Sequence, residues 1–119
     1  MKNQSSLIQK YINAAIANGE AVKVGNHRVA NREYAKLTRI YRKLEKDHSL
    51  ANTIINELLQ NPNHLVFGWA SAHALGLNIS VDKAEKLLDE ITKMSGIGIL
   101  RLDAEMTLKE WRRKRKLTF

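Results

Sequence analysis

The sequence of 119 residues has no cysteine and no long apolar run, and each absence excludes a class of structure. Without cysteine the chain cannot form disulfides or cysteine-ligated metal sites, which is typical of proteins in a reducing compartment. The first twenty residues, MKNQSSLIQKYINAAIANGE, carry polar residues every few positions and so lack the apolar core of a signal peptide. No later segment approaches the roughly 18 apolar residues of a membrane span. We therefore expect a soluble, cytoplasmic protein without a membrane partner.

The sequence motifs of catalysis and cofactor binding are also missing. The four histidines, His27, His48, His64 and His73, form no i,i+4 pair and no HExxH motif, which argues against zinc. There is no GxxxxGK[ST] or GxGxxG loop for a phosphate. Ser71 lies two residues before His73 and so points to another side of a helix, which leaves no visible Ser-His-acid triad. We expect no enzyme, no cofactor and no metal, and we expect His73 to be a hydrogen-bonded core residue.

The net charge of +8 is distributed unevenly along the chain. Residues 1–46 carry 10 Lys or Arg against 3 acidic residues, a net charge of +7. Residues 47–105 carry 4 against 8, a net charge of −4, and residues 106–119 carry 6 against 1, a net charge of +5. Two positive ends therefore flank a negative middle, so an attraction to polyanions is opposed by the central part.

Apolar residues recur at three-to-four spacing along most of the chain, which predicts one all-α domain over residues 1–119. The pattern predicts about six helices stacked as antiparallel pairs, over 5–18, 31–46, 48–59, 62–75, 80–94 and 97–114. Asn31, Asp47 or Ser49, and Ser80 are the expected N-caps, and Gly19 is the expected end of the first helix. Residues 114–119 are expected to form a basic tail.

Residues 21–30 allow two interpretations. Valines surround Gly25-Asn26, and Gly-Asn is an accepted two-residue turn, so a short β-hairpin is one of them. A loop between two helices is the interpretation that we favour.

The stretch LLQNPNHLVFGWASAHALGL, residues 58–77, predicts a helical hairpin around which the chain is organised. Asn61 can cap the second helix, Pro62 suits its first position, and Gly76 suits its left-handed end. Trp69 falls within one turn of small residues, so another helix can approach closely beside its ring.

A basic ridge is predicted on the 31–46 helix, where five cations step by 4, 3, 4 and 3 residues: Arg32, Lys36, Arg39, Lys43 and Lys46. It lies opposite an apolar stripe that includes Tyr34 and Tyr41. Such a ridge can follow phosphates, and Arg112 and Arg113 near the C-terminus can add a second contact. The other interpretation is a solvated helix face with a frayed basic end. The two tyrosines fit the core stripe, so base stacking has little support.

An acidic ridge is predicted on the 80–94 helix, formed by Asp82, Glu85 and Asp89, with Glu90 beside them. Such a ridge can imitate a phosphate backbone and bind the basic cleft of a nuclease. The other interpretation is that these residues only stabilise their own helix. The helix dipole favours Asp82 near the helix start, and Glu85 and Asp89 pair with neighbouring lysines.

The stretch 58–77 resembles a HEAT-type unit, although Gly68 and Trp69 stand where an Arg is usual. Together with VANREY, KAEKLLDEI and LDAEMTLKEWRR, it is similar to the small bacterial domain-of-unknown-function family 2019, over roughly Leu7 to Arg113. Members of such families often look like immunity partners of bacterial toxins. The resemblance therefore implies a cytoplasmic protein-binding module that covers the active site of a cognate toxin. Nucleic-acid binding through the basic ridge is the alternative.

Overall fold

The computed structural model describes residues 2–119, with side chains from residue 4 onward, and this part of the chain forms six α-helices without a strand. They are α1 (Lys2–Lys23), α2 (His27–Lys46), α3 (His48–Leu59), α4 (His64–Leu77), α5 (Val81–Thr92) and α6 (Ile99–Lys114). The predicted all-α class and the helix count are confirmed. Within residues 2–119, every helix is too short or too polar to cross a bilayer.

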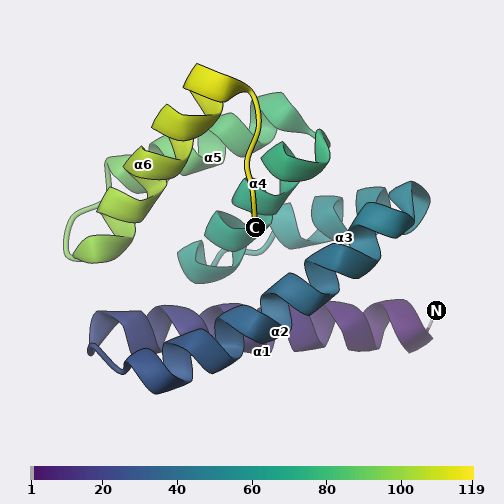
Figure 1. Cartoon of the computed structure of the whole chain (residues 1–119), viewed down its shortest axis with the longest axis horizontal. Helices are drawn as coiled ribbons and strands as arrows, with labels where there is room; N and C mark the ends of the chain where they lie inside the picture. Colours follow the sequence, from purple (N-terminus) through teal and green to yellow (C-terminus); the bar gives the residue numbers. More distant parts are fainter. Residues whose placement is uncertain (1) are drawn as a thin grey trace.

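The helices pack in consecutive pairs, as predicted: α1 with α2, α3 with α4, and α5 with α6. Figure 1 shows the α1–α2 pair along the lower edge and the α5–α6 pair along the upper edge, with α4 between them. Helix α4 also contacts α1, α5 and α6. Nine of its 14 residues are buried, as expected for a helix that is apolar on nearly every side.

Helix α1 is longer than predicted, because Gly19 does not end it. The helix continues to Lys23. A Cβ atom at position 19 would clash with the side chain of Leu65 in α4, so the glycine permits a close approach of the two helices. The sequence interpretation used glycine as a helix end, whereas packing against α4 explains its presence.

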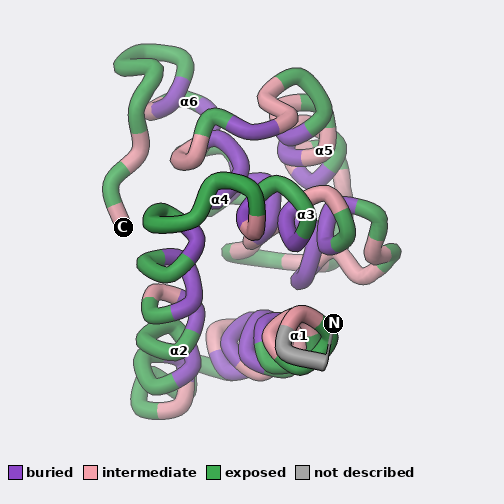
Figure 2. Tube along the Cα trace, turned by 90° about the vertical axis from the view of Figure 1, so that its right-hand side faces the viewer, coloured by how far each residue is buried: buried purple, intermediate pink, exposed green. Residues whose placement is uncertain are grey.

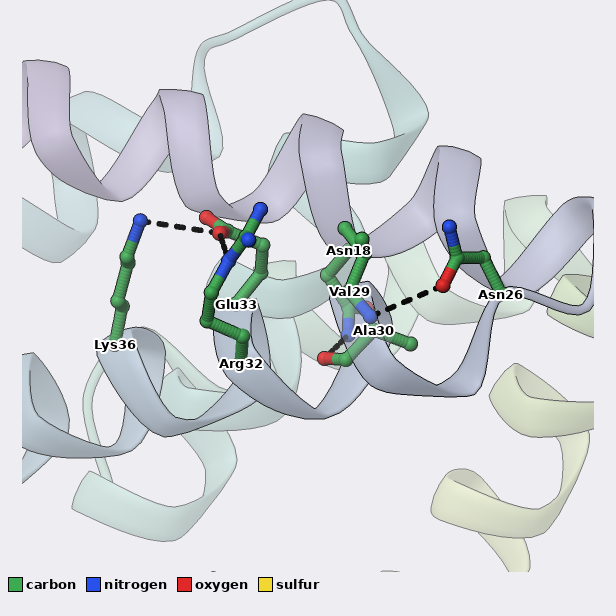
Figure 3. Close-up of polar contacts among 7 residues, drawn as sticks. All are labelled: Asn18, Asn26, Val29, Ala30, Arg32, Glu33 and Lys36. Atoms are coloured by element: carbon green, nitrogen blue, oxygen red, sulfur yellow. Dashed lines mark hydrogen bonds and ion pairs between the residues drawn. The ribbon is translucent and has the colours of Figure 1, made fainter.

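The segment 21–30 contains a loop between two helices, as we favoured, and not a hairpin, but the loop is short. Only residues 24–26 turn the chain, with Gly25 at φ +72°, and α2 begins at His27. The Asn26 side chain caps α2 by accepting a hydrogen bond from the Val29 N–H at 3.2 Å (Figure 3). Asn31, the predicted cap, therefore lies inside the helix. Asp47 is the N-cap of α3, as predicted, and accepts from the Leu50 N–H at 3.1 Å.

At the corner between α3 and α4, the N-cap of α4 is a different asparagine from the predicted one. Asn63 caps α4 by accepting from the Leu65 N–H at 2.9 Å. Asn61 instead accepts from the Asn63 N–H at 2.9 Å, and Pro62 precedes the helix rather than opening it. The Asn-Pro-Asn break is a turn stabilised by side chains on both sides of the proline.

Helix α4 passes through Gly76 and ends at Asn78, which takes the left-handed conformation at φ 58°. A Cβ atom at Gly76 would come within 2.6 Å of the Tyr41 hydroxyl and 2.8 Å of the Phe119 ring, so this glycine also permits close packing. Ser80 lies at the predicted N-cap of α5 but makes no side-chain cap bond. Its hydroxyl lies 2.6 Å from Asn56 Oδ1 and ties the start of α5 to α3.

The cations of the predicted basic tail, residues 114–119, are exposed, but Leu117 and Phe119 within it are partly buried. Lys114 ends α6, and the chain then turns at Arg115, which has φ 55°. The last residues run back toward α4 (Figure 1), where Leu117 packs against the core. The Phe119 ring lies with its centroid 4.8 Å from that of Tyr41 in α2. This segment therefore bridges α6 and the α2–α4 region.

Candidate functional site

The predicted basic ridge lies on the exposed side of α2. All five predicted cations are exposed, and Arg28 adds a sixth at the same helical spacing. Figure 2 shows α2 buried along one edge and exposed along the other. The expectation that Tyr34 belongs to the buried stripe was wrong, since Tyr34 is 39% exposed, whereas its neighbour Glu33 is only 4% exposed.

Glu33 holds two members of the ridge. The Arg32 Nε and Lys36 Nζ atoms each lie 3.0 Å from Glu33 Oε2 (Figure 3). Burial acts to raise the pKa of Glu33, but the hydrogen bonds and charges of these cations outweigh it and hold the pKa below its ordinary value. Among the side chains of residues 4–119, Arg39, Lys43 and Lys46 form no ion pair. These three can meet an external anion without breaking an internal contact.

Several C-terminal cations, by contrast, are engaged in contacts within the protein. Arg112 Nε lies 2.9 Å from Glu85 of α5, and Arg113 lies 2.7 Å from Glu110. Arg115 stacks over the Trp111 ring with its guanidinium carbon 4.4 Å from the centroid. Arg112 and Arg113 are therefore engaged within the protein.

The predicted acidic ridge lies on α5 and is partly neutralised as well. Glu85 is held by Arg112, and Asp89 lies 3.1 Å from Lys93. Asp82 and Glu90 are exposed and form no ion pair with the side chains described in residues 4–119. The ridge therefore presents two engaged and two unengaged carboxylates.

A hydroxyl and an imidazole meet in the interior. The Tyr11 hydroxyl of α1 lies 2.6 Å from His73 Nδ1 of α4, and the two residues are 0% and 1% exposed. The prediction that His73 is a hydrogen-bonded core residue is confirmed. Desolvation, with a smaller effect of the Arg42 charge, lowers the pKa of His73 to about 3, and burial raises that of Tyr11. The ring is thus neutral, and a neutral Nδ1 can accept the tyrosine proton in a hydrogen bond.

Aromatic rings enclose this pair on its other sides. The centroid of the His73 ring lies 4.7 Å from that of Tyr41, 4.8 Å from that of Phe119 and 5.4 Å from that of Trp69. We define these residues together with Tyr11 as the aromatic niche. Because its central pair is buried, the niche has the geometry of a packed core.

An open pocket of about 380 Å³ lies between the α1–α2 pair and helices α4 to α6. Its walls are mostly apolar and include Leu88 and Ile91 of α5 and Leu100 and Ala104 of α6. Tyr34 and Trp69 line it together, with their ring centroids 5.6 Å apart. A volume at the lower end of the ~300–1,000 Å³ range of ligand pockets suits one side chain or a small ligand.

Asn18 fixes the indole of Trp69 at this pocket. The Trp69 Nε1–H donates to Asn18 Oδ1 at 3.1 Å, while Asn18 Nδ2 donates to the Ala30 carbonyl at 2.9 Å (Figure 3). One amide thus joins α1, α2 and α4 through both of its polar atoms. The orientation of the indole is therefore set before any ligand arrives.

Besides Tyr34, two titratable groups line the described pocket. Asp103 is the only Asp, Glu, Lys or Arg among the described lining residues, and desolvation by its surroundings raises its pKa. His64 lines the pocket at the start of α4, and desolvation followed by the charge of Lys23 lowers its pKa. His64 is therefore neutral at pH 7.

Exposed apolar side chains gather at the same place. In the part of the chain that the structure describes, the large exposed apolar residues are Val24, Tyr34, Ile99, Leu102 and Met106. Tyr34 and Met106 line the pocket, and Ile99 and Leu102 continue the stripe of Met106 along α6. We name Ile99, Leu102 and Met106 the apolar rim.

Sequence reasoning missed both the pocket and its rim. The signal for the rim was present, because residues 99, 102 and 106 repeat at helical spacing on the side of α6 opposite the buried stripe of Ala104, Leu108 and Trp111. Asp103 stands between the two stripes. The pocket itself needs α2, α4 and α6 in one place, which spacing within single helices does not encode.

Comparisons of the chain with protein-family models, curated protein sequences and solved structures return no match.

Proposed function

We propose that this protein is a non-enzymatic protein-binding module, and most concretely a cytoplasmic immunity protein that neutralises a bacterial toxin by covering its active site. The observation that carries the proposal is that two of the five exposed large apolar residues, Tyr34 and Met106, line one pocket, while Ile99 and Leu102 share a face of α6 with Met106. Protein interfaces concentrate aromatic, apolar and methionine side chains near such pockets, with polar residues around them.

The pocket and the apolar rim are the binding surface that this proposal favours. The acidic ridge of Asp82, Glu85, Asp89 and Glu90 stays a prediction as a second contact. Its support is weaker, because Arg112 and Lys93 already hold two of the four carboxylates. A partner that used all four would have to replace those internal ion pairs.

The similarity to the domain-of-unknown-function family 2019 stays a prediction too, since no family model matches. The expectation that the partner is a toxin comes from this similarity. The expectation that the partner is a protein comes from the apolar rim.

The test is co-expression with the product of the adjacent gene. We expect the two products to copurify, and we expect the double variant Leu102→Gln, Met106→Gln to abolish the complex while leaving the fold intact, since both side chains are exposed. The matched control is Glu105→Gln, Lys109→Gln, which changes two exposed residues of the same helix. A neighbouring product that does not bind, or binds the rim variant as tightly as the native protein, overturns the proposal.

Nucleic-acid binding is the second candidate function, favoured by the three unpaired cations Arg39, Lys43 and Lys46 on α2. A phosphate backbone could follow them without disturbing Glu33. The expected result is a gel shift whose affinity falls with salt, and whose logarithmic slope decreases by about 1.8 when Arg39 and Lys43 become Ala, at about 0.9 for each phosphate contact. No shift at low salt eliminates this function, and an unchanged slope removes α2 from the interface.

A further inference from the structure

The pocket beside the apolar rim differs in charge from the protein around it. The chain carries a net charge of +8, yet no Lys or Arg belongs to the described pocket lining, and the only ionised side chain there is Asp103. The carboxylate is reachable from solvent, since Asp103 is exposed, although the pocket wall removes part of its hydration. It forms no ion pair among the side chains of residues 4–119. Asp103 can therefore accept a cation from outside.

The other lining groups suit a cation with a flat, weakly hydrated head. Tyr34 and Trp69 present two tilted aromatic rings, and rings of this kind attract cations over their faces. The indole N–H is already used by Asn18, and no Lys or Arg belongs to the described lining, so the pocket offers no cationic side chain of that kind to attract an anion. A guanidinium stacks on aromatic rings and pairs with a carboxylate through two parallel hydrogen bonds, whereas an ammonium keeps its water more strongly.

We propose that this pocket binds an arginine side chain of the protein partner, with the guanidinium between the Asp103 carboxylate and the Tyr34–Trp69 rings. The aliphatic part of the arginine lies against Leu100 and Met106 at the pocket wall. This inference rests on the proposed protein-binding function, and it supplies the anchor residue of that interface. An arginine in a desolvated pocket is among the commonest energetic centres of protein interfaces.

The experiment is an NMR titration of the isotope-labelled protein with Nα-acetyl-arginine methylamide, a probe that carries only the guanidinium charge. The Trp69 indole N–H is the reporter, and the indole of Trp111, which is 4% exposed and does not line the pocket, is the internal reference. We expect a saturable shift of the Trp69 signal. We expect Asp103→Asn to raise the dissociation constant about tenfold, equivalent to about 1.4 kcal/mol.

Two further probes and one variant complete the design. The lysine analogue should bind more weakly than the arginine probe, and the uncharged norleucine analogue more weakly still. Glu105→Gln, which removes a carboxylate from the same helix outside the pocket, should leave the arginine affinity unchanged. Equal binding of arginine and norleucine, unchanged affinity in Asp103→Asn, or no saturable shift at all overturns the inference.

The titration needs no partner, so its failure is distinct from failure of the proposed function. If the probe binds but the adjacent gene product does not, the pocket recognises a guanidinium and the protein-binding proposal fails. If the adjacent product binds through the rim but the probe does not shift Trp69, the rim is the interface and the arginine anchor is wrong.

Discussion

The aromatic niche and the open pocket both join aromatic rings to a titratable group, and Trp69 belongs to both. In the niche, the Tyr11 hydroxyl occupies His73 Nδ1 and both residues are buried. In the pocket, Asp103 is exposed and unpaired, and Tyr34 remains 39% exposed. Similar residue types therefore serve the stability of the fold in one place and leave a surface for recognition in the other.

The difference has a structural cause. The niche lies where α1 packs on both α2 and α4 and Tyr41 of α2 reaches the His73 ring, and Gly76 lets Tyr41 and Phe119 approach the α4 backbone. At the pocket, Gly68 and Ala72 of α4 are small, and Asp103 of α6 faces the opening instead of an apolar residue that could fill it. Substitutions of the niche residues that do not line the pocket, Tyr11, Tyr41 and His73, should thus change stability alone, whereas substitution of an exposed pocket residue such as Asp103 should change binding with little cost in stability.

The largest expected effect is Tyr11→Ala, which removes a fully buried ring from the niche. We expect a loss of about 3–5 kcal/mol in the free energy of unfolding, as for other buried aromatic residues. Tyr11→Phe keeps the ring and should cost about 1–3 kcal/mol, because His73 Nδ1 then lacks its donor. Chemical denaturation measures both. A loss below 1 kcal/mol for Tyr11→Ala would contradict the structural role of the niche.

The next effect is a decrease of stability with acid. The pKa of His73 is lowered to about 3 in the folded state, whereas an unfolded histidine has a pKa near 6.5. Below pH 6.5 the unfolded chain therefore binds a proton that the folded protein does not, and the equilibrium shifts toward unfolding. The contribution of His73 is fully present above pH 6.5 and is lost as the pH falls toward 3. Between pH 7 and pH 5 we expect a loss of about 2 kcal/mol from this group.

A variant separates the pH dependence of stability due to His73 from that due to other titrating groups. His64, whose pKa is also lowered, acts in the same direction, whereas Glu33 acts only at lower pH. Replacing His73 by Gln should remove most of the slope of unfolding free energy against pH between 7 and 5. An unchanged slope would show that His73 is solvated in the folded state.

Trp69→Ala tests one of the two residues, Trp69 and Phe119, that the two regions share. Because its ring is only partly buried, we expect a loss of about 2 kcal/mol, below the ~3–5 kcal/mol of a fully buried tryptophan. The interface with the partner should weaken at the same time, since one wall of the pocket is removed. A loss of stability with unchanged partner binding would assign Trp69 to the niche alone.

The smallest stability effect is expected for Asp103→Asn. The side chain is exposed and unpaired, so the free energy of unfolding should change by no more than about 0.5 kcal/mol. Thermal unfolding of the variant beside the native protein measures this. A large loss would mean that Asp103 is a structural residue, and the contrast between pocket and niche would fail.

The sequence predicted the helices, their pairing and the buried His73, because these depend on periodicity within short segments. Its errors occurred where tertiary contacts changed the role of a local signal. Gly19 and Gly76 look like helix ends, yet they lie inside helices at close contacts with Leu65 and Phe119. Residues 114–119 look like a basic tail and their cations are exposed, but Leu117 packs against the core and the Phe119 ring lies beside that of Tyr41.

The candidate site was less accessible to sequence reasoning than the fold. Charge spacing located two ridges correctly on α2 and α5, but it could not show that Arg112 of α6 pairs with Glu85. Similarly, Asp103 looks like one of several helix acids until Tyr34 and Trp69 are placed beside it. Contacts between residues distant in sequence decide which of these groups remain available.

The most direct test of the central claim is hydrogen exchange of the protein alone and in complex with the adjacent gene product. The account predicts additional protection of the amides of residues 99–107, which carry the apolar rim and Asp103, with the segments of the acidic and basic ridges unchanged. Protection confined to α2 or to residues 82–90, with residues 99–107 exchanging as in the free protein, would contradict it.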